Sequence, residues 1–452
     1  MLSLVCSLAI VASGAARSEQ AGWVCLHLSG SPHHIGYEYG RQAAKEIDDA
    51  NRTLRAYLKH STNKDWKFFR SAATRLFKSK LEPEYRQEIQ GLSDGLKSNG
   101  YHYDFTDMLV QNAWIELAWY YVPKFDAEQA KKPVESKAPY NCSAFVATGS
   151  QTKDHKVVMA HNCWVDYVIG ERWNLILDIK PEHGNRILMD AWPGFIHSGD
   201  DFAVNSAGIM VTETTIGSFH GFDEKGVPEF MRARKAVQYS NSLDDFARIM
   251  KAGNNGGYAN DWLVANANTN EIGELELGLK NVVFKTTTDG VIVSSNFPKD
   301  GKLVAEECDG SLSKGPNCCV DRHARWDYLM GKNLGKVDAQ VGKQWLGDHH
   351  DQVRGLDKAC GSTLCGHLDA DNRPGFAAIL GPDYTPAGAV QGKVMTSDLA
   401  KKMSFWAHMG HPCGQDFLVT PFYAKHPEYK WESPYLKDMK SKPWTLVSAL
   451  SR

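Results

Sequence analysis

One cysteine stands where a loosely built segment meets the first predicted strand of a sheet. Cys142 lies in the string PYNCS (residues 139–143), at the end of the charged, proline-containing residues 124–140, which predict a linker or surface loop. Cleavage between Asn141 and Cys142 would give Cys142 a free α-amino group. An α-amine has a pKa near 8 and a thiol near 8.5, so this amine could accept the thiol proton of its own residue. The sequence therefore offers Cys142 as a nucleophile that self-cleavage would create; a structural cysteine before a strand is the alternative.

The elements that must position Cys142 follow from hydrophobic spacing. Residues 40–120 predict helices, and residues 231–252 and 321–347 predict further helices after the linker. From Ser143 onward the pattern alternates as in strands. The predicted strands are Ser143–Thr148, Lys156–Ala160, Trp173–Ile179, Arg186–Asp190, Ile209–Glu213, Asp261–Ala265, Gly273–Leu279 and Val291–Ser294. Runs of strands with segregated helices predict an α+β fold in one structural domain.

The composition excludes several classes of protein. The 452 residues carry 51 Lys and Arg against 53 Asp and Glu, a formal net charge of -2 that offers no basic field for nucleic acid. No apolar run is long enough for a membrane-spanning helix, and the mean hydropathy is -0.40. We therefore expect no nucleic-acid partner and no integral membrane contact.

The first residues and the cysteines indicate where the chain acts. Residues 1–16 combine a short apolar stretch with small residues and predict a signal peptide, hence export. Asn51 and Asn141 begin formal glycosylation sequons. Ten cysteines include a late cluster, for which an exported protein predicts one to three disulfides; buried free thiols are the alternative. The members of this cluster are Cys308, Cys318, Cys319, Cys360, Cys365 and Cys413.

Four strings resemble the cysteine-type N-terminal-nucleophile hydrolases, in particular the phospholipase B-like proteins and the peptidase C45 group that includes acyl-CoA:6-aminopenicillanate acyltransferase. The most specific is PGFIHSGDDFAVNSAGIMVTETTIG (residues 193–217), which is very close to the phospholipase B-like family. The others are GSPHHIGYEYGRQAA (30–44), NCSAF with VVMAHNCWVDY (141–167) and VIVSSNF (291–297). A weaker string, DRHARWDYL (321–329), resembles the C45 group. All of them occur in the family order.

The resemblance implies a four-layer αββα sandwich that is made as an inactive precursor. The precursor would cut itself between Asn141 and Cys142, leaving a helical chain of residues 17–141 and a catalytic chain of residues 142–452. Cys142 matches the nucleophile, His161 a histidine that moves protons or orients the amine, and Asn296 an amide that donates to the oxyanion. A hydrogen-bonded core histidine and a turn-capping asparagine are the alternatives for the last two.

Further residues match supporting positions of these families. Asp166 would hold the charged α-amine, although its string reads Asn-Cys-Trp-Val-Asp where the C45 group has Asn-Trp-Asp, so the two registers differ. Arg322, or in its place Arg325, would bind substrate; a surface ion pair is the alternative. Alternation along a strand would point Thr212 and Thr214 to one face. The other matched residues are Trp164, Asn205 and Asn260, with turn chemistry the alternative for Asn205.

The resulting expectation is an exported, self-processing hydrolase that acts on an acyl amide or acyl ester, with a small acyl amide or a lipid as substrate and no cofactor or metal. Neither Asp200 with Asp201 nor residues 348–351 is expected to bind an ion, and the latter predict a solvated helix end. The alternatives are an acyltransferase of the C45 type and a catalytically inactive binding protein on the same fold. A papain-like protease would need a helix after the cysteine, whereas residues 143–146 alternate as a strand.

Overall fold

Two β-sheets form the centre of the molecule in the computed structural model, which describes residues 16–136, 142–296, 298–309, 317–373 and 383–450. The larger sheet has nine strands in the order β1-β2-β5-β6-β7-β8-β9-β10-β11. These are β1 (Arg17–Gln20), β2 (Trp23–Gly30), β5 (Leu175–Pro181), β6 (Ile187–Ala191), β7 (Ala203–Asn205), β8 (Ile209–Thr215), β9 (Asn260–Asn266), β10 (Glu271–Leu277) and β11 (Val282–Thr287). Neighbouring strands run antiparallel except β2 and β5, which run parallel.

The smaller sheet has six antiparallel strands in the order β12-β3-β4-β15-β16-β17. These are β12 (Gly290–Ser294), β3 (Cys142–Thr148), β4 (Val158–Asp166), β15 (Ala387–Thr396), β16 (Ser404–Met409) and β17 (Thr445–Ser448). One face of β3 packs on β8 and β9 of the larger sheet. The apolar faces of the two sheets meet in one cluster of side chains. Its fully buried members include Ala144 and Met159 of the smaller sheet and Met210 and Leu263 of the larger one.

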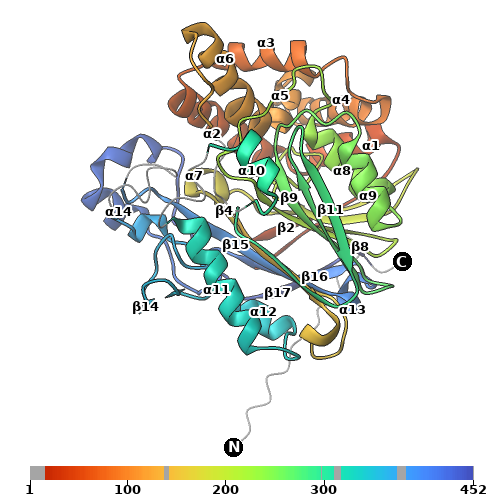
Figure 1. Cartoon of the computed structure of the whole chain (residues 1–452). Coiled ribbons are helices and arrows are strands. Elements are labelled where there is room, and N and C mark those ends of the chain that lie inside the picture. Colours follow the sequence, from red (N-terminus) through yellow and green to blue (C-terminus); the bar gives the residue numbers. More distant parts are fainter. Residues whose placement is uncertain (1–15, 137–141, 297, 310–316, 374–382, 451–452) are drawn as a thin grey trace, which may run out of the picture.

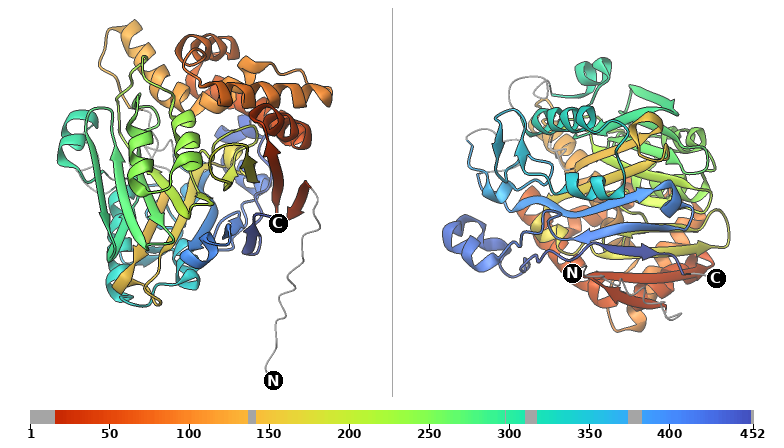
Figure 2. Two further views of the ribbon diagram at one scale, coloured as in Figure 1. Left: turned by 90° about the vertical axis from the view of Figure 1, so that its right-hand side faces the viewer. Right: turned by 90° about the horizontal axis from the view of Figure 1, so that it is seen from below.

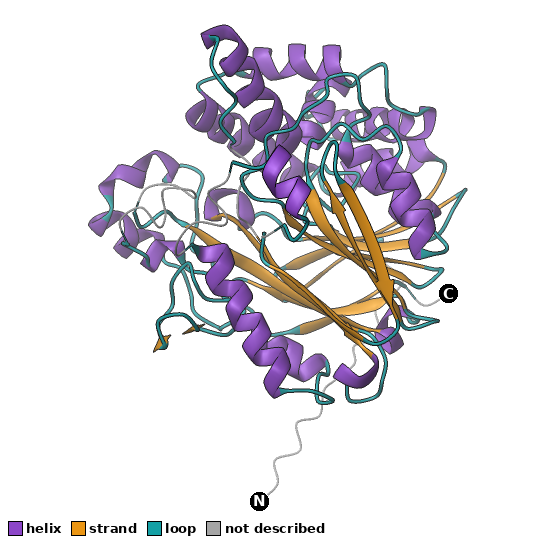
Figure 3. Ribbon diagram, viewed as in Figure 1, coloured by secondary structure: helices purple, strands orange, loops and turns teal. Residues whose placement is uncertain are grey.

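Helices cover the outer faces of both sheets, with the strands between them in Figure 3. Figure 1 shows the helices of the N-terminal part at the top of the view and α11 and α12 on the lower side. The N-terminal helices are α1 (Pro32–Gln42), α2 (Ala44–Thr62), α3 (Trp66–Leu76), α4 (Pro83–Ser98), α5 (Phe105–Glu116), the π-helical η1 (Leu117–Tyr121) and α6 (Val122–Ala130). Helices α8 (Glu229–Tyr239) and α9 (Leu243–Lys251) contact the larger sheet, whereas α11 (Cys318–Lys332) and α12 (Ala339–Leu346) contact the smaller one.

The glycines of the first resembling string are explained by helix packing. Helix α1 begins at Pro32, with Ser31 as its N-cap, and crosses α4 at very close range. A Cβ atom at Gly36 would lie 1.9 Å from the backbone oxygen of Glu88, and one at Gly40 would lie 2.2 Å from that of Leu92. Only glycine allows this approach, so the spacing of glycines in this string serves packing rather than chemistry.

The mixed helix and strand content agrees with the predicted α+β class, and each predicted strand is present with shifted ends. Three features differ from the prediction. Helix α6 extends to Ala130, so the linker is shorter than residues 124–140. Residues 17–30 form β1 and β2 rather than helix, and β2 pairs with β5, so the segments before and after Cys142 share one sheet. Figure 2 shows the first strands (red) near the end of the chain (dark blue), where Gln20 hydrogen-bonds to Thr445.

The structure bears on the features that predict export: the signal peptide, the glycosylation sequons and the disulfides. Residues 1–15 of the predicted signal peptide lie outside the described residues, as does Asn141. The nine cysteines in the described ranges are all free thiols, so the structure contains none of the predicted disulfides among them. Asn51 is fully buried and donates to Gln111 at 2.7 Å, which removes this sequon as a glycosylation site in the folded chain. Among the described helices, none has the length and apolar character needed to cross a membrane.

Candidate active site around Cys142

Cys142 is the first residue of β3, where it pairs with Cys163 of the antiparallel β4. Its side chain is 2% exposed. Its backbone N–H donates to Oδ1 of Asn296 at 3.0 Å. The strand ladder fixes the backbone after Cys142, and Asn296 fixes its nitrogen, so the thiol projects from a rigid strand end rather than from a mobile loop.

Arg322 on α11 holds the other side of Cys142. Its guanidinium donates to the carbonyl oxygen of Cys142, to Oγ of Ser143 at 2.8 Å and to Oδ1 of Asn296 at 2.9 Å. The guanidinium carbon lies 4.2 Å from the ring centre of Trp164. Arg322 is fully buried, and a buried charge of this kind persists only where hydrogen bonds and an aromatic face compensate for the lost water. The arginine thus orients both Cys142 and the amide that holds its nitrogen.

Asn296 sits just beyond β12 in a backbone conformation that suits asparagine. Its φ is 66°, in the left-handed region that asparagine tolerates better than most residues. The side-chain nitrogen donates to the Thr215 carbonyl at 2.8 Å, and the backbone N–H donates to Thr214 Oγ1 at 3.2 Å. Thr214 in turn shares a 2.6 Å hydrogen bond with Ser294. Asn296 therefore presents its acceptor, not its donor, to Cys142.

A carboxyl group faces the thiol from the larger sheet. Oε1 of Glu213 on β8 lies 4.0 Å from Sγ of Cys142 and accepts a hydrogen bond from the hydroxyl of Tyr258 at 3.1 Å. With its amide oriented to donate, Asn260 bonds Oε2 of Glu213 at 3.0 Å. Burial, and after it the charge of Cys142, raises the pKa of Glu213 well above its ordinary value. This direction favours the protonated carboxyl, which can donate or relay a proton.

His161 approaches the thiol from β4, and its sulfur-facing nitrogen, Sγ of Cys142 and a Glu213 oxygen all lie within 4.8 Å of one another. Within the described chain, neither ring nitrogen of His161 has a hydrogen-bond partner. Nδ1 lies 3.9 Å from Oδ2 of Asp200, and that carboxylate also contacts the buried ammonium of Lys393. An imidazole with free nitrogens between a thiol and a carboxylate is placed to move a proton.

The electrostatic surroundings favour the thiolate of Cys142. Burial by itself raises the pKa of this thiol, but the hydrogen bond from Cys163 and the proximity of His161 outweigh it and lower the pKa to about 5. Burial, and after it the hydrogen bond to Cys142, raises the pKa of Cys163 well above its ordinary value, so the proton stays on Cys163. A thiolate at neutral pH is the nucleophilic form of cysteine.

The other predicted residues fall into two groups. Trp164 belongs to the site through Arg322, and Thr212 lies buried on the same strand as Thr214, with no hydrogen-bond partner for its hydroxyl among the described residues. Asp166 instead accepts a hydrogen bond from the hydroxyl of Tyr57 at 2.6 Å on α2, and none of its described contacts reaches Cys142. The structure therefore gives Asp166 a different partner from the amine that the resemblance implied.

Asn205 and Arg325 have structural surroundings. Oδ1 of Asn205 accepts from the backbone N–H groups of Ala207 and Ile209, and its amide nitrogen donates to two carbonyls at the end of α8. These bonds use the whole side chain to shape the β7–β8 turn, in agreement with the turn-chemistry alternative. Arg325 pairs with Asp348 at 2.6 Å, so Arg322 is the arginine that reaches the site.

Sequence reasoning missed the buried acids and the lysine. Glu213, Asp201 and Lys393 are each no more than 4% exposed, and the pKa of Asp201 is raised well above its ordinary value by burial and by its neighbour Asp200. Their only signal in the sequence is a charged residue within, or beside, an apolar strand. That signal marks a buried charge but not its partner, because Asp200 and Lys393 are far apart in the chain. Lys393 lies on β15 of the smaller sheet and Asp200 in the segment between β6 and β7 of the larger sheet, and the two meet only in the folded chain.

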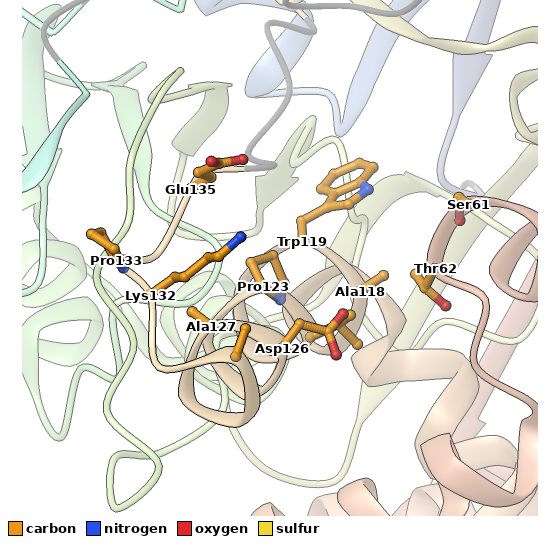
Figure 4. A pocket seen from close by; sticks show the side chains of 12 residues that line it. Ser61, Thr62, Ala118, Trp119, Pro123, Asp126, Ala127, Lys132, Pro133 and Glu135 are labelled. Carbon is orange, nitrogen blue, oxygen red and sulfur yellow. The ribbon is translucent and has the colours of Figure 1, made fainter.

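An open pocket with a volume of about 560 Å³ and a lining of apolar and polar side chains is linked to this site through two aromatic residues (Figure 4). Trp119 of the π-helical segment η1 forms part of its wall, and the Trp119 ring packs against that of Tyr258 at 6.2 Å. Tyr258 in turn hydrogen-bonds to Glu213, which faces Cys142. The lining residues are Ser61, Thr62, Ala118, Trp119, Val122, Pro123, Asp126, Ala127, Ala130, Lys132, Pro133 and Glu135.

Comparison with known proteins places these residues in a family context. An uncharacterized protein of Archaeoglobus fulgidus is 25% identical over 249 residues, which cover 52% of this chain and 40% of the relative. Phospholipase B-like 1 of Homo sapiens is 29% identical over 117 residues, which cover 24% of this chain and 21% of the relative. Phospholipase B-like 1 of Rattus norvegicus is 27% identical over 142 residues, which cover 29% of this chain and 24% of the relative. The chain thus matches less than half the length of these relatives.

The family model described as Phospholipase B matches residues 31–301, well over half of the chain. This region contains Cys142, His161, Glu213 and Asn296, whereas Arg322 follows it. The strings that carry the resemblance in the sequence fall within it as well, apart from the first residue of the earliest string and the weaker string at 321–329. The chain therefore belongs to the phospholipase B family.

Proposed function

We propose that this chain is a self-processing hydrolase that cleaves an acyl ester or acyl amide through an acyl-enzyme on Cys142. The observation that carries the proposal is the buried strand-end thiol whose nitrogen is held by Asn296, whose carbonyl is held by Arg322 and whose pKa is lowered to about 5. We infer further that the two sheets and their two helical coverings form the αββα sandwich of N-terminal-nucleophile hydrolases.

The first step is self-cleavage. Sγ of Cys142 attacks the carbonyl carbon of Asn141, the peptide C–N bond breaks, and the nitrogen of Cys142 takes up a proton, which His161 can deliver. Water then hydrolyses the resulting thioester and frees the thiol. The hydrogen bond from the Cys142 nitrogen to Asn296 keeps the departing nitrogen in place, so that the new α-amine stays beside the sulfur.

The second step is acyl transfer in the processed enzyme. The thiolate attacks the carbonyl carbon of the substrate, the leaving alcohol or amine departs with a proton from His161 or the α-amine, and water releases the acid. Asn296 then serves as the acceptor that holds the α-amine, a role in place of the oxyanion donation that the resemblance implied. Glu213, whose carboxyl lies 4.0 Å from the thiol, and Asn260, whose amide bonds that carboxyl, are the candidate oxyanion donors in its place.

The pocket in Figure 4 fits the acyl chain of such a substrate. Its alanine, valine, proline and tryptophan side chains offer an apolar lining, and ligand sites of a few hundred Å³ accommodate chains of this kind. Together with the names of the relatives, this lining favours deacylation of a lipid ester over cleavage of a polar amide. Transfer of the acyl group to an acceptor other than water is the alternative outcome at the same centre.

A processing and activity experiment tests the proposal. The purified chain should yield two fragments on a denaturing gel, and the mass of the larger one should correspond to a start at Cys142. Cys142→Ala should stay intact and release no fatty acid from vesicles of phosphatidylcholine, whereas Cys25→Ala, which changes a half-buried thiol on β2, should behave as wild type. A wild-type protein that remains one chain with full activity would refute self-cleavage, and an active Cys142→Ala would refute the nucleophile.

A further inference from the structure

A second cluster of thiols and imidazoles lies outside the residues that the family model matches. It consists of His349, Cys365, His367 and Cys413, whose ligand atoms all lie within 4.8 Å of one another. Nε2 of His367 lies 3.2 Å from Nε2 of His349 and 3.5 Å from the sulfur atoms of both Cys365 and Cys413. Four soft or borderline donor atoms thus converge on one point.

The distances match the edges of a tetrahedral zinc site. With zinc–nitrogen bonds of about 2.05 Å and zinc–sulfur bonds of about 2.3 Å, a tetrahedron places two nitrogens ~3.3 Å apart and a nitrogen and a sulfur ~3.5 Å apart. The observed separations of 3.2, 3.5 and 3.5 Å agree with these values. A simple thiol–imidazole hydrogen bond would bring two of these atoms together but gives no reason for all four to lie within 4.8 Å of one another.

Three separate segments deliver the four side chains. His349 follows α12, Cys365 and His367 lie in the loop before the short helix η3 (Leu368–Ala370), and Cys413 follows β16. The backbone N–H of Gln415 points at Sγ of Cys413 at 3.4 Å, an interaction that stabilises a thiolate. This convergence from distant parts of the chain is what a cross-linking ion achieves.

Neighbouring groups support the orientation of the ligands. The carboxylate of Asp369 lies 3.8 Å from Nδ1 of His367 and accepts from the hydroxyl of Tyr167 at 2.7 Å. Outer carboxylates beside a ligating histidine favour the tautomer that leaves Nε2 free for the metal. The nearby His411 is not a fifth ligand through Nδ1, because this nitrogen lies 2.6 Å from the carbonyl of Ala389 and carries the proton of that bond.

We propose that His349, Cys365, His367 and Cys413 bind one Zn²⁺ ion in a closed, structural site. Two thiolates balance the charge of the ion, and four protein ligands leave no open position for a catalytic water. The sequence pattern predicts no metal at residues 348–351, where it suggests a solvated helix end, and the chain contains no C-x-x-C pair that would indicate a zinc site. The structure corrects the prediction of a solvated helix end: Asp351 is buried against Arg354, and the side chain of His349 points to the cluster.

The ion would hold the loop that supports the catalytic centre. A Cβ atom at Gly366, between two of the ligands, would lie 2.0 Å from the ring of Trp164, the ring that carries Arg322. Asn162 on β4 donates to the carbonyl of Leu364 at 2.9 Å in the same loop. Loss of the metal would therefore loosen Trp164 and, through it, Arg322.

Metal analysis of the full-length chain tests this proposal, which does not depend on the reaction at Cys142. Protein purified without chelators should contain about one zinc per chain, and the apo protein refilled with Co²⁺ should show the visible bands of a tetrahedral thiolate complex. His349→Ala and Cys413→Ser should lose the metal. The matched control His350→Ala changes the adjacent histidine, which pairs with Asp357 instead, and should retain it.

Two further measurements cover variants that fail to fold. In the wild-type protein, a chelator should lower the melting temperature, and added Zn²⁺ should restore it. Iodoacetamide should label Cys365 and Cys413 only after chelation. A wild-type protein without bound metal, a Cys365–Cys413 disulfide in its peptide map, or an unchanged zinc content in both ligand variants would overturn the proposal.

Discussion

The two thiol centres of this chain use similar residue types in opposite ways. Around Cys142, one thiol meets one imidazole and a carboxyl group, and an arginine and an asparagine hold its backbone and nitrogen. In the second centre, two thiols and two imidazoles converge on a single point. In the proposed enzyme, the first arrangement concentrates reactivity in one sulfur, whereas the second is the proposed site of a zinc ion.

The difference shows which surroundings favour a reactive thiol and which favour metal binding. Cys142 starts a strand, its neighbour Cys163 keeps a proton that stabilises the thiolate, and a pocket is linked to the site through two aromatic residues. Cys413 lines none of the described pockets. Its neighbours are instead the ligand atoms of His349, Cys365 and His367, with which it would bind the proposed metal ion. Arg322 and Trp164 connect the two centres, so changes there test whether the second centre supports the first.

The largest effect among these tests is expected for Arg322→Lys. Lysine keeps the charge, but its single ammonium cannot bond the carbonyl of Cys142, Ser143 and Asn296 together, so both processing and hydrolysis should suffer. We expect a loss of about 10²–10³-fold in kcat on processed enzyme. Arg325→Lys is the matched control on the same helix, and an equal loss in both variants would contradict the special position of Arg322.

Asn296 allows a comparison between two roles for one side chain. Asn296→Asp keeps an acceptor for the nitrogen of Cys142 and tolerates the positive φ, but it lacks the amide donor. If Asn296 holds the nitrogen, Asn296→Asp should keep kcat within about tenfold of wild type while Asn296→Ala loses about 10²-fold or more. Equal, large losses of kcat in the two variants, measured on processed enzyme, would instead indicate that the Asn296 amide donates to the oxyanion.

The pH dependence should distinguish the reactive thiol from the metal-binding ones. Because the pKa of Cys142 is lowered to about 5, its thiolate is present above that pH and disappears as the pH falls through it. Inactivation by iodoacetamide and the acid limb of activity should follow this midpoint. Cys163→Ala removes the hydrogen bond that lowers the pKa, so the midpoint should rise by about one pH unit; an unmoved midpoint would assign the shift to His161.

Asn205→Ala should have the smallest effect on catalysis. Its side chain bonds four backbone groups in and beside the β7–β8 turn and none at Cys142, so we expect an unchanged kcat and a loss of about 1–3 kcal/mol in the free energy of unfolding. Denaturant unfolding together with steady-state kinetics measures both quantities. A kcat reduced tenfold without loss of stability would contradict this prediction and indicate that Asn205 takes part in catalysis.

The sequence by itself was sufficient for much of the local structure and for naming Cys142 as the candidate nucleophile. Alternating residues after Ser143 and helical spacing before residue 120 follow from periodicities of two and 3.6 residues, which a chain carries in its order. The strings around Cys142 and at 193–217 were sufficient for the family. Helix α6 was missed because charged, proline-containing residues can still form a helix whose other face packs on neighbours that the local pattern does not contain.

Tertiary structure decided which side chains meet. Asn296 and Arg322 surround Cys142 because β12 pairs with β3 and α11 packs on that sheet. Asp166 bonds Tyr57 because the short helix α7 (Tyr167–Gly170), which follows Asp166, packs on α2. His349, Cys365, His367 and Cys413 show the same dependence, since their spacing matches no short zinc motif. The order of residues determines whether each segment can form a helix or a strand. Contacts between distant segments depend on how these elements pack and on where each side chain points, and both are defined only in the folded chain.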